Sequence, residues 1–486
     1  MNIIPGGAAC LAALLAMNPA LAAPLTGEQR NAIDASVAAY EPRMIEVAQT
    51  IWENPELGYL EVETAALLAS ELQEHGFTVE TGIGDMPTAF VARRGSGEGP
   101  VIAILAEMDA LPGFSQAAVP HEEPIAGVTS GHACGHHLFG AGSVAAAIAL
   151  AEYAEAQGLA GEVRLYGAPA EEGGSGKAYL ARSGALDDVD TVLHWHPAAS
   201  NSASQGASLS NVSAKFRYHG QSAHAALAPD QGRSALDALE ATTFMINLMR
   251  EHVPQDARIH YVISDGGSAP NVVPDFAELY LYVRHQDPDV VAAIYDRIQR
   301  AAKGAAMGTE AEVEFERISG VYSILPNDTL GQAMDRNLRA AAPIEWDAAE
   351  VAFAEELQPT LRNQPDLAGA FEVEDYEFGG VGYYSSDVGD VSWIAPTVGL
   401  GTATYVPGTP QHSWQAVATG GMSISHKGTA YAARVMAATG AELMQTPELI
   451  EKAKTEFDAA RGEEFEYRAL VGDRMPPLDY RVSNAD

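Results

Sequence analysis

The stretch that decides the fold is VIAILAEMDALP, residues 101–112. Its first six residues are all apolar, which is typical of a strand that is buried on both faces of a sheet. An alanine-rich run at 141–156 follows, and two more strand-like runs come at 163–166 and 189–193. Strand, helix and strand in this order predict an α/β catalytic domain with a mostly parallel central sheet.

Residues that bind metals or move protons follow each of these strand-like runs. Asp109 follows the first run, Glu171 and Glu172 follow the second, and His194 follows the third. A single Glu-Glu pair is usually a solvated surface, but open α/β sheets place their functional sites beyond the carboxyl ends of their strands. We therefore expect these side chains to meet at one edge of the sheet.

A loop cysteine and two more histidines extend this set. Cys134 and His136 lie two residues apart across a glycine, a spacing that lets both side chains face one site, and His412 lies far along the chain. Thiolate, imidazole and carboxylate are all ligands of zinc, and five ligands suit two ions that share a bridge. We predict two divalent ions per subunit, zinc or manganese. The predicted ligands are Cys134, His136, Glu172, His194 and His412.

Glu171 is the carboxylate that this assignment leaves free. Next to a ligand, it can take a proton from a metal-bridged water and return it to the leaving amine, as a general base and acid. Asp109 can orient a metal-bound imidazole. Three further histidines lie beside proposed ligands and are candidates to support them: His132, His137 and His196.

The middle of the chain has a different pattern. Residues 211–320 alternate as strand, helix, strand, strand, helix and strand, which predicts an inserted ferredoxin-like α+β domain for dimerisation and lid formation. The catalytic domain then has two parts, 27–210 and 321–486, and its second part includes an apolar run at 391–394. The last forty-odd residues, from Pro447 onward, carry no chemistry that the sequence assigns.

The net charge of the chain limits its possible binding partners, and its N-terminal segment indicates where in the cell it is found. The net charge of −37 over 486 residues argues against nucleic acid and anionic membrane surfaces as partners. Residues 1–23 read as a secretory signal, with cleavage near Ala22 or Ala23, so we expect export, to the periplasm, and otherwise a cytoplasmic protein. Removing this segment leaves Cys134 as the one cysteine, which excludes an intramolecular disulfide.

Six motifs resemble the aminoacylase and carboxypeptidase-like metallopeptidase family, in particular its amidohydrolase branch. The resemblance implies metal ligation by the five predicted ligands, with Glu171 as proton shuttle. It favours His194 over His196, because the family's ligand is followed by two residues and then proline. The motifs are NPELG (54–58), MDALP (108–112), GHACGH (131–136), APAEEGG (168–174), SAHAA (222–226) and APNVVP (269–274).

The resemblance also implies a homodimer formed through the inserted domain. His224 would then stabilise the oxyanion of the tetrahedral intermediate, across the dimer or within its own subunit. Asn271 and Arg284 match lid positions that hold the substrate near its carboxylate, and a guanidinium suits that role through a bidentate pair. A structural salt bridge is the alternative for Arg284.

Two more segments bear on the substrate, SSDVGDVSW (385–393) and GTPQHSW (408–414). Their resemblance implies a metal-dependent amidohydrolase that cleaves small N-acyl or N-aroyl amino acids, of the p-aminobenzoyl-glutamate type. Glu107 and His137 stand where many relatives carry Asp, which leaves the substrate's identity open. The alternatives are a dipeptidase or carboxypeptidase of the same family, or a catalytically inactive metal-containing binding protein. The free carboxylate of Glu171 argues against the binding protein.

Overall fold

The computed structural model describes residues 24–482, so the predicted signal segment, 1–23, lies outside the described residues. The central sheet has six strands in the order β1-β2-β6-β3-β7-β15. Neighbours from β6 to β15 run parallel, whereas β1 and β2 join antiparallel at the other edge, so the predicted mostly parallel sheet is confirmed. The strands are β1 (Thr78–Thr81), β2 (Phe90–Gly95), β3 (Val101–Glu107), β6 (Glu162–Ala168), β7 (Thr191–Leu193) and β15 (Thr397–Val398).

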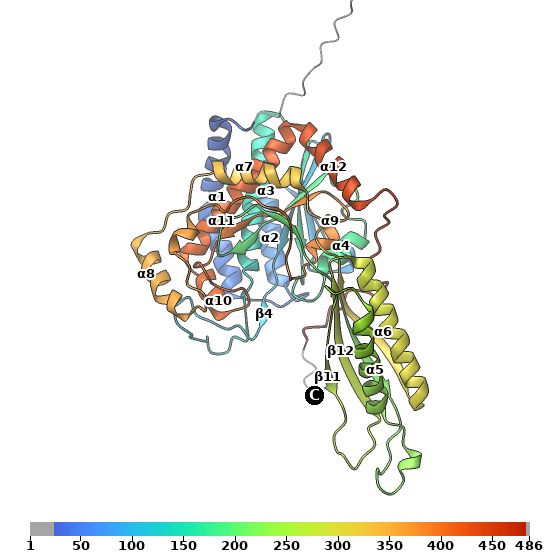
Figure 1. Cartoon of the computed structure of the whole chain (residues 1–486). Helices are drawn as coiled ribbons and strands as arrows, with labels where there is room; N and C mark the ends of the chain where they lie inside the picture. The colour runs from blue at the N-terminus through green and yellow to red at the C-terminus, as the bar shows by residue number, and fades with distance from the viewer. Residues whose placement is uncertain (1–23, 483–486) are drawn as a thin grey trace, which may run out of the picture.

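Helix α3 (His136–Gln157) lies at the centre of the main domain (Figure 1). Its sequence is apolar on every side, which is typical of a helix buried all round, and nearly all of its residues are buried. It packs between α1 (Gly27–Glu53) and α11 (Ser423–Gln445) and against β3. Because close packing on all sides fixes the helix, its first residue, His136, is held at the end of the sheet.

The inserted domain is a separate four-stranded antiparallel sheet with two helices, and it projects from the main domain (Figure 1). Its strand order, β11-β12-β10-β13, is the ferredoxin-like order that the sequence predicts. The domain has a hydrophobic core of its own, between the sheet and the helices. Its elements are β10 (Ser210–His219), α5 (Ala235–Met249), β11 (Arg258–Asp265), β12 (Phe276–His285), α6 (Pro288–Thr309) and β13 (Glu312–Val321).

Shorter elements complete the main domain. The apolar run at 391–394 begins inside a helix, α9, and the neighbouring strand of the sheet follows it as β15. The remaining helices are α2 (Val62–Glu74), α4 (Gly176–Arg182), α7 (Asp328–Ala340), α8 (Ala348–Leu357), α9 (Val388–Ser392), α10 (Trp414–Gly420) and α12 (Pro447–Arg461). The remaining strands are β4 (Leu111–Pro112), β5 (Ser130–Gly131), β8 (His196–Ala198), β9 (Gln205–Ala207), β14 (Phe378–Val381) and β16 (Gly401–Ala403).

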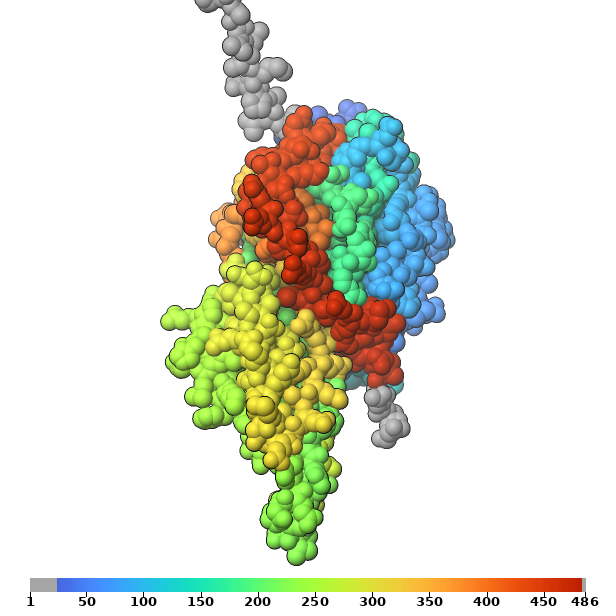
Figure 2. Space-filling model, turned by 90° about the vertical axis from the view of Figure 1, so that its right-hand side faces the viewer, coloured from blue at the N-terminus to red at the C-terminus, as the bar shows by residue number. Residues whose placement is uncertain are grey.

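After α12 the chain continues as an irregular segment, residues 462–482, which we call the C-terminal arm. It crosses the junction of the two domains and contacts both (Figure 2). On the inserted domain, Arg317 donates to the carbonyl of Leu470 (2.5 Å). On the main domain, Arg182 donates to the carbonyls of Gly472 and Arg474 (2.7 Å each). The arm therefore fastens the inserted domain to the catalytic domain.

A buried carboxylate beneath the arm predicts a pH effect on stability. Burial raises the pKa of Asp390 to about 7, although hydrogen bonds from the Tyr467 hydroxyl (2.6 Å) and the Tyr322 amide (3.1 Å) oppose the shift. The folded state then holds a proton that the unfolded chain releases above its ordinary pKa of 3.8. This stabilisation is complete below that value and is lost as the pH rises through about 7.

We expect Asp390→Asn to be more stable than the wild type at pH 8, because the amide keeps the shape and never ionises. The unfolding free energy of Asp390→Asn exceeds that of the wild type at high pH, and this difference should shrink by roughly 1.4 kcal/mol for each unit that the pH falls from about 7 to about 4. Urea unfolding at pH 5, 6, 7 and 8 measures it. The exposed Asp458→Asn is the control and should keep the wild-type slope. If the unfolding free energies of Asp390→Asn and the wild type change with pH in the same way, the prediction is wrong.

Candidate metal centre

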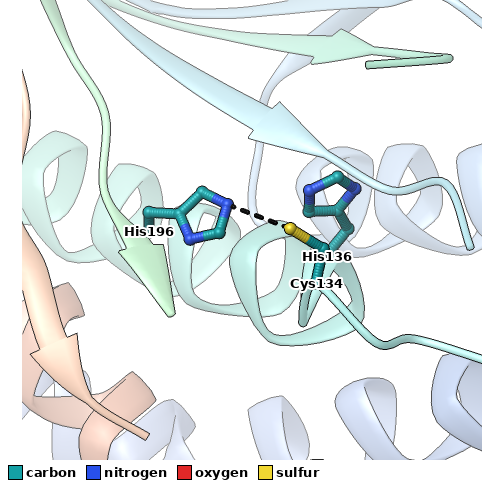
Figure 3. Close-up of side chains that lie close together, drawn as sticks. All are labelled: Cys134, His136 and His196. Carbon is teal, nitrogen blue, oxygen red and sulfur yellow. Dashed lines mark hydrogen bonds between the residues drawn. The ribbon is translucent and has the colours of Figure 1, made fainter. Parts of the chain in front are cut away.

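Three donor side chains meet at the start of α3, as Figure 3 shows. Cys134 lies in the loop before the helix, His136 is the first helical residue, and His196 begins β8. The Sγ of Cys134 lies 3.6 Å from the Nε2 of His196, and one donor atom from each residue lies within 4.8 Å of the others. Thiolate and two imidazoles at this spacing can surround one divalent ion.

The glycine between Cys134 and His136 makes this arrangement possible. Gly135 has a φ of +79°, in the left-handed region that favours glycine. A Cβ at this position would lie 2.3 Å from the Tyr405 hydroxyl oxygen and 2.8 Å from the Cβ of Pro197. Any larger residue would therefore separate the two ligands from the strand end that they face.

A second donor group shares Cys134 with the first. It comprises Cys134, Glu172 and His412, again within 4.8 Å of one another. The Nε2 of His412 lies 3.0 Å from Oε1 of Glu172. His412 has a φ of +55°, an uncommon value for a residue with a side chain, and its amide donates to the carbonyl of Ala133 (2.9 Å). Two donor groups with a common cysteine fit two ions that share a bridging ligand.

The hydrogen bonds around this cluster leave its lone pairs free for cations. The Nδ1 of His136 lies 3.0 Å from both the carbonyl and the Oδ1 of Asp109, so this nitrogen donates to Asp109 and Nε2 is left as an acceptor. Nε2 of His136 lies 3.0 Å from Oε2 of Glu107, and Oε1 of Glu172 lies 3.0 Å from Nε2 of His412, but neither contact has the geometry of a hydrogen bond. Buried donor and acceptor atoms that face one another without forming hydrogen bonds fit ligands that a cation would bring together.

The charges of the cluster also call for cations. Burial raises the pKa of the Cys134 thiol, and a thiol must lose its proton to bind metal. Burial, together with the carboxylates of Glu107 and Glu172, raises the pKa of Glu171 well above its ordinary value. Bound divalent ions would favour the ionised form of both groups.

One buried cation partly balances these carboxylates. The Nζ of Lys177, at the start of α4, lies 2.7 Å from Oε1 of Glu107 and 2.6 Å from Oδ1 of Asp387. All three side chains are buried. Burial lowers the pKa of Lys177, but the two carboxylates more than offset this and hold it above its ordinary range. The lysine therefore stays charged and fixes Glu107 beside His136.

Sequence reasoning selects His194, whereas the geometry favours His196. His194 belongs to none of the donor groups found among residues 24–482. Its ring packs against the backbone of Gly399, where a Cβ would lie 2.7 Å from Nε2. The rings of His132 and His137 contact each other at a tilt of 45°, with centroids 4.9 Å apart, and neither residue belongs to a donor group among the described residues.

The predicted substrate residues of the inserted domain lie in two places. His224 and Asn271 are both exposed and adjacent, since the backbones of His224 and Val272 pair and the amide of Ala225 donates to the carbonyl of Asn271 (3.0 Å). They line neither cavity at the metal centre, whereas Arg284 lines one of them. Within one subunit, therefore, Arg284 alone of these three faces the site.

Two cavities meet at the cluster. The first, which we call the lid cleft, has a volume of about 730 Å³ and lies between the main domain, the inserted domain and the C-terminal arm. The second, which we call the core cavity, has a volume of about 460 Å³ and extends into the main domain past His196 and Leu400. They share five lining residues, namely Glu171, Glu172, Ser385, Ser386 and His412. A bond held at this junction would have one half of the substrate in each cavity.

Sequence reasoning missed four residues at this site. Lys177 and Asp387 are 210 positions apart, and neither lies in a recognisable metal-binding pattern. Tyr480 and Arg481, on the C-terminal arm, both donate to the carbonyl of Glu172. Their one sequence signal is an aromatic residue beside an arginine in a segment with no periodic pattern, which is too weak to indicate a site.

Comparison with known proteins agrees with this geometry. Residues 103–373 match the model of peptidase family M20/M25/M40. The chain is 40% identical over 451 residues to one of the subunits of the p-aminobenzoyl-glutamate hydrolase of Escherichia coli, covering 87% of this chain and 94% of that protein. It is 28% identical to the Xaa-Arg dipeptidase of Mus musculus, covering 87% and 90%.

Solved structures give the same answer for the fold. The YXEP protein of Bacillus subtilis, a dinuclear metal binding peptidase from the M20 family, superimposes with a TM-score of 0.58 at 21% identity. The match covers 84% of this chain and 99% of that one. Fold, paired donor groups and sequence similarity all agree, so this chain belongs to peptidase family M20/M25/M40 and is a metallohydrolase that acts on amide or peptide bonds.

Proposed function

We propose that the protein hydrolyses the amide bond of N-acyl or N-aroyl amino acids, with p-aminobenzoyl-glutamate as a representative substrate. The observation that carries this proposal is the junction of two unlike cavities at the paired donor groups. The lid cleft is lined by charged groups of the inserted domain and suits the amino-acid half, whereas the core cavity contains Ile324, Leu400 and Tyr384 and suits the acyl half. Similarity to one subunit of the p-aminobenzoyl-glutamate hydrolase of Escherichia coli supports the same substrate class.

The residues of the chain divide the chemistry between them. The donor groups of Cys134, His136 and His196 and of Cys134, Glu172 and His412 would hold two divalent ions, zinc or manganese, which when bound would supply Lewis acidity and lower the pKa of a water molecule at the site. Glu171 lines both cavities, so it can take the proton of the attacking water and deliver it to the leaving nitrogen. Asp109 holds the imidazole of His136 through Nδ1, and Lys177 holds Glu107 against the same ring.

We also propose a homodimer, in which His224 of one subunit serves the site of the other. His224 is exposed and lines neither cavity of its own subunit. Strand β11 is at the edge of its sheet, and exposed apolar side chains lie on it and on the neighbouring helix α5. An edge strand with an apolar face favours pairing with a second copy. The side chains are Phe244, Leu248, Val262 and Ile263.

A substrate panel tests the proposed function. We expect the metal-loaded protein to cleave p-aminobenzoyl-glutamate and hippurate, because the core cavity offers an acyl group apolar contacts. We expect glycyl-glutamate, whose free ammonium would have to enter that cavity, to be cleaved at least about 10-fold less efficiently, since burying an unpaired charge is costly. Product release followed by mass spectrometry gives kcat/KM for each. A preference for the free dipeptide would instead support a dipeptidase, and no turnover of any amide would support a binding protein.

A further inference from the structure

The end of the C-terminal arm reaches the metal centre. The Tyr480 hydroxyl and an Nη2 of Arg481 both donate to the backbone carbonyl of Glu172, at 3.1 and 2.5 Å. The Tyr480 ring contacts the edge of Tyr59, with centroids 5.6 Å apart, and both arm residues line the lid cleft. Arg481 is thus fixed beside a proposed metal ligand, although it lies 309 positions away in the sequence.

Four lysine and arginine side chains line the lid cleft, and two of them have no ion-pair partner in the part of the chain that the structure describes. Arg217 pairs with Glu278 (2.8 Å) and Glu316 (2.6 Å), and Lys215 pairs with Glu278 (3.2 Å). The remaining two are Arg284 and Arg481. Neither forms an ion pair with any residue between 24 and 482, and the Nε atom of each is buried without a hydrogen-bond partner there.

Each of these two guanidiniums lies over a tyrosine ring. Arg284 lies over the ring of Tyr282, 5.3 Å from its centroid, and Arg481 lies over the ring of Tyr480 at 4.8 Å. In a chain with a net charge of −37, two arginines in one cleft without an ion-pair partner among the described residues are unusual. Because a buried donor without a partner is costly, and the carboxylates that line the cleft pair with neither arginine, the two guanidiniums favour an anionic ligand.

We propose that Arg481 binds the side-chain carboxylate of an amide whose amino-acid half is dicarboxylic, such as an N-acyl glutamate. This inference rests on the proposed function and specifies its substrate class. Arg284, which lines the same cleft from β12 of the inserted domain, takes the other carboxylate, and the scissile carbonyl then lies at the junction with the core cavity. The C-terminal arm is therefore a specificity element of the active site.

Fastening the arm does not require Arg481. Arg182, Arg317 and the Tyr480 hydroxyl already anchor its backbone, and Arg474 donates to the carbonyl of Arg317. The guanidinium of Arg481 uses one N–H on the carbonyl of Glu172, which leaves its Nε and its second terminal nitrogen for a ligand.

A pair of matched substrates tests the proposal. p-Aminobenzoyl-glutamate and p-aminobenzoyl-glutamine have the same shape and differ by one negative charge. We expect the metal-loaded wild type to prefer the glutamate compound in kcat/KM by about 10- to 100-fold, the effect of a charged hydrogen bond. Arg481→Gln should abolish this preference through KM and leave kcat within a few-fold, and Arg481→Lys should restore part of it. Arg474→Gln, which removes an arm contact outside the cleft lining, should keep the preference.

The outcomes separate this inference from the proposed function. If the wild type does not distinguish the two substrates, or if Arg481→Gln loses activity equally on both, the inference is wrong while the function stands. If the wild type hydrolyses neither compound, the proposed function fails. Calorimetric binding of the same two compounds then decides the inference: discrimination that disappears in Arg481→Gln supports it, and equal binding to both proteins overturns it. Thermal unfolding of each variant identifies any that has lost its fold.

Discussion

Glu171→Gln is expected to lower kcat by about 10²- to 10⁴-fold while the protein keeps its fold and its metal ions. The amide fills the same space but cannot accept a proton from the attacking water. Glu171 belongs to a group with Glu107 and His136, yet neither donor group built on Cys134 includes it. The substitution should therefore leave those two groups intact.

Its neighbour provides the control. Glu172→Gln removes a member of the donor group that contains Cys134 and His412, so it should lower the metal content as well as the activity. Turnover under saturating substrate, metal content by mass spectrometry and the melting temperature separate the two variants. Wild-type kcat in Glu171→Gln would refute the proton-transfer role, and loss of metal from that variant would make Glu171 a ligand instead.

Local sequence predicts the helices and strands that are buried on all sides, because their residues are apolar without interruption. The run 101–106 becomes the buried strand β3, and the alanine-rich stretch becomes the buried helix α3, because no polar face is needed in either case. The apolar run at 391–394 shows the limit of this reasoning. A short apolar run fits a strand or a buried helix equally well, and here packing against α4 gives a helix.

The sequence pointed to Glu172 and Asp109 because each follows a strand, and to Cys134 because it lies two residues from His136 across a glycine. The site was not predictable where tertiary contacts alone bring residues together. The pairing of Lys177 with Asp387, and that of Arg481 with the carbonyl of Glu172, join segments without any shared periodicity. Such contacts depend on how loops and the C-terminal arm pack, which short-range sequence patterns do not encode.

The choice between His194 and His196 has a local cause. Both follow β7, and the intervening Trp195 is buried, with its indole N–H donating to the carbonyl of Phe139 (3.2 Å). Because alternate side chains of an extended chain share a face, both histidines lie opposite Trp195. The backbone continues extended from β7 into β8, and its amides at His194 and His196 donate to the carbonyls of Val398 and Leu400. Two residues further along the same face, His196 lies beside Cys134, whereas His194 lies against Gly399. A motif counted along the sequence cannot tell which of two histidines on one face lies beside Cys134.

His196→Ala is therefore expected to lose about one metal ion per subunit and more than about 100-fold in kcat/KM, because a direct ligand matters at least as much as the groups that support it. His194→Ala is the matched control: it should keep the wild-type metal content and change mainly KM, since His194 lines the core cavity. Metal content after dialysis and the thiolate-to-metal absorption of the cobalt-substituted protein report on the site without activity. If His194→Ala loses the metal and His196→Ala keeps it, the ligand is His194, and the ring must rotate toward Cys134 when the ions bind.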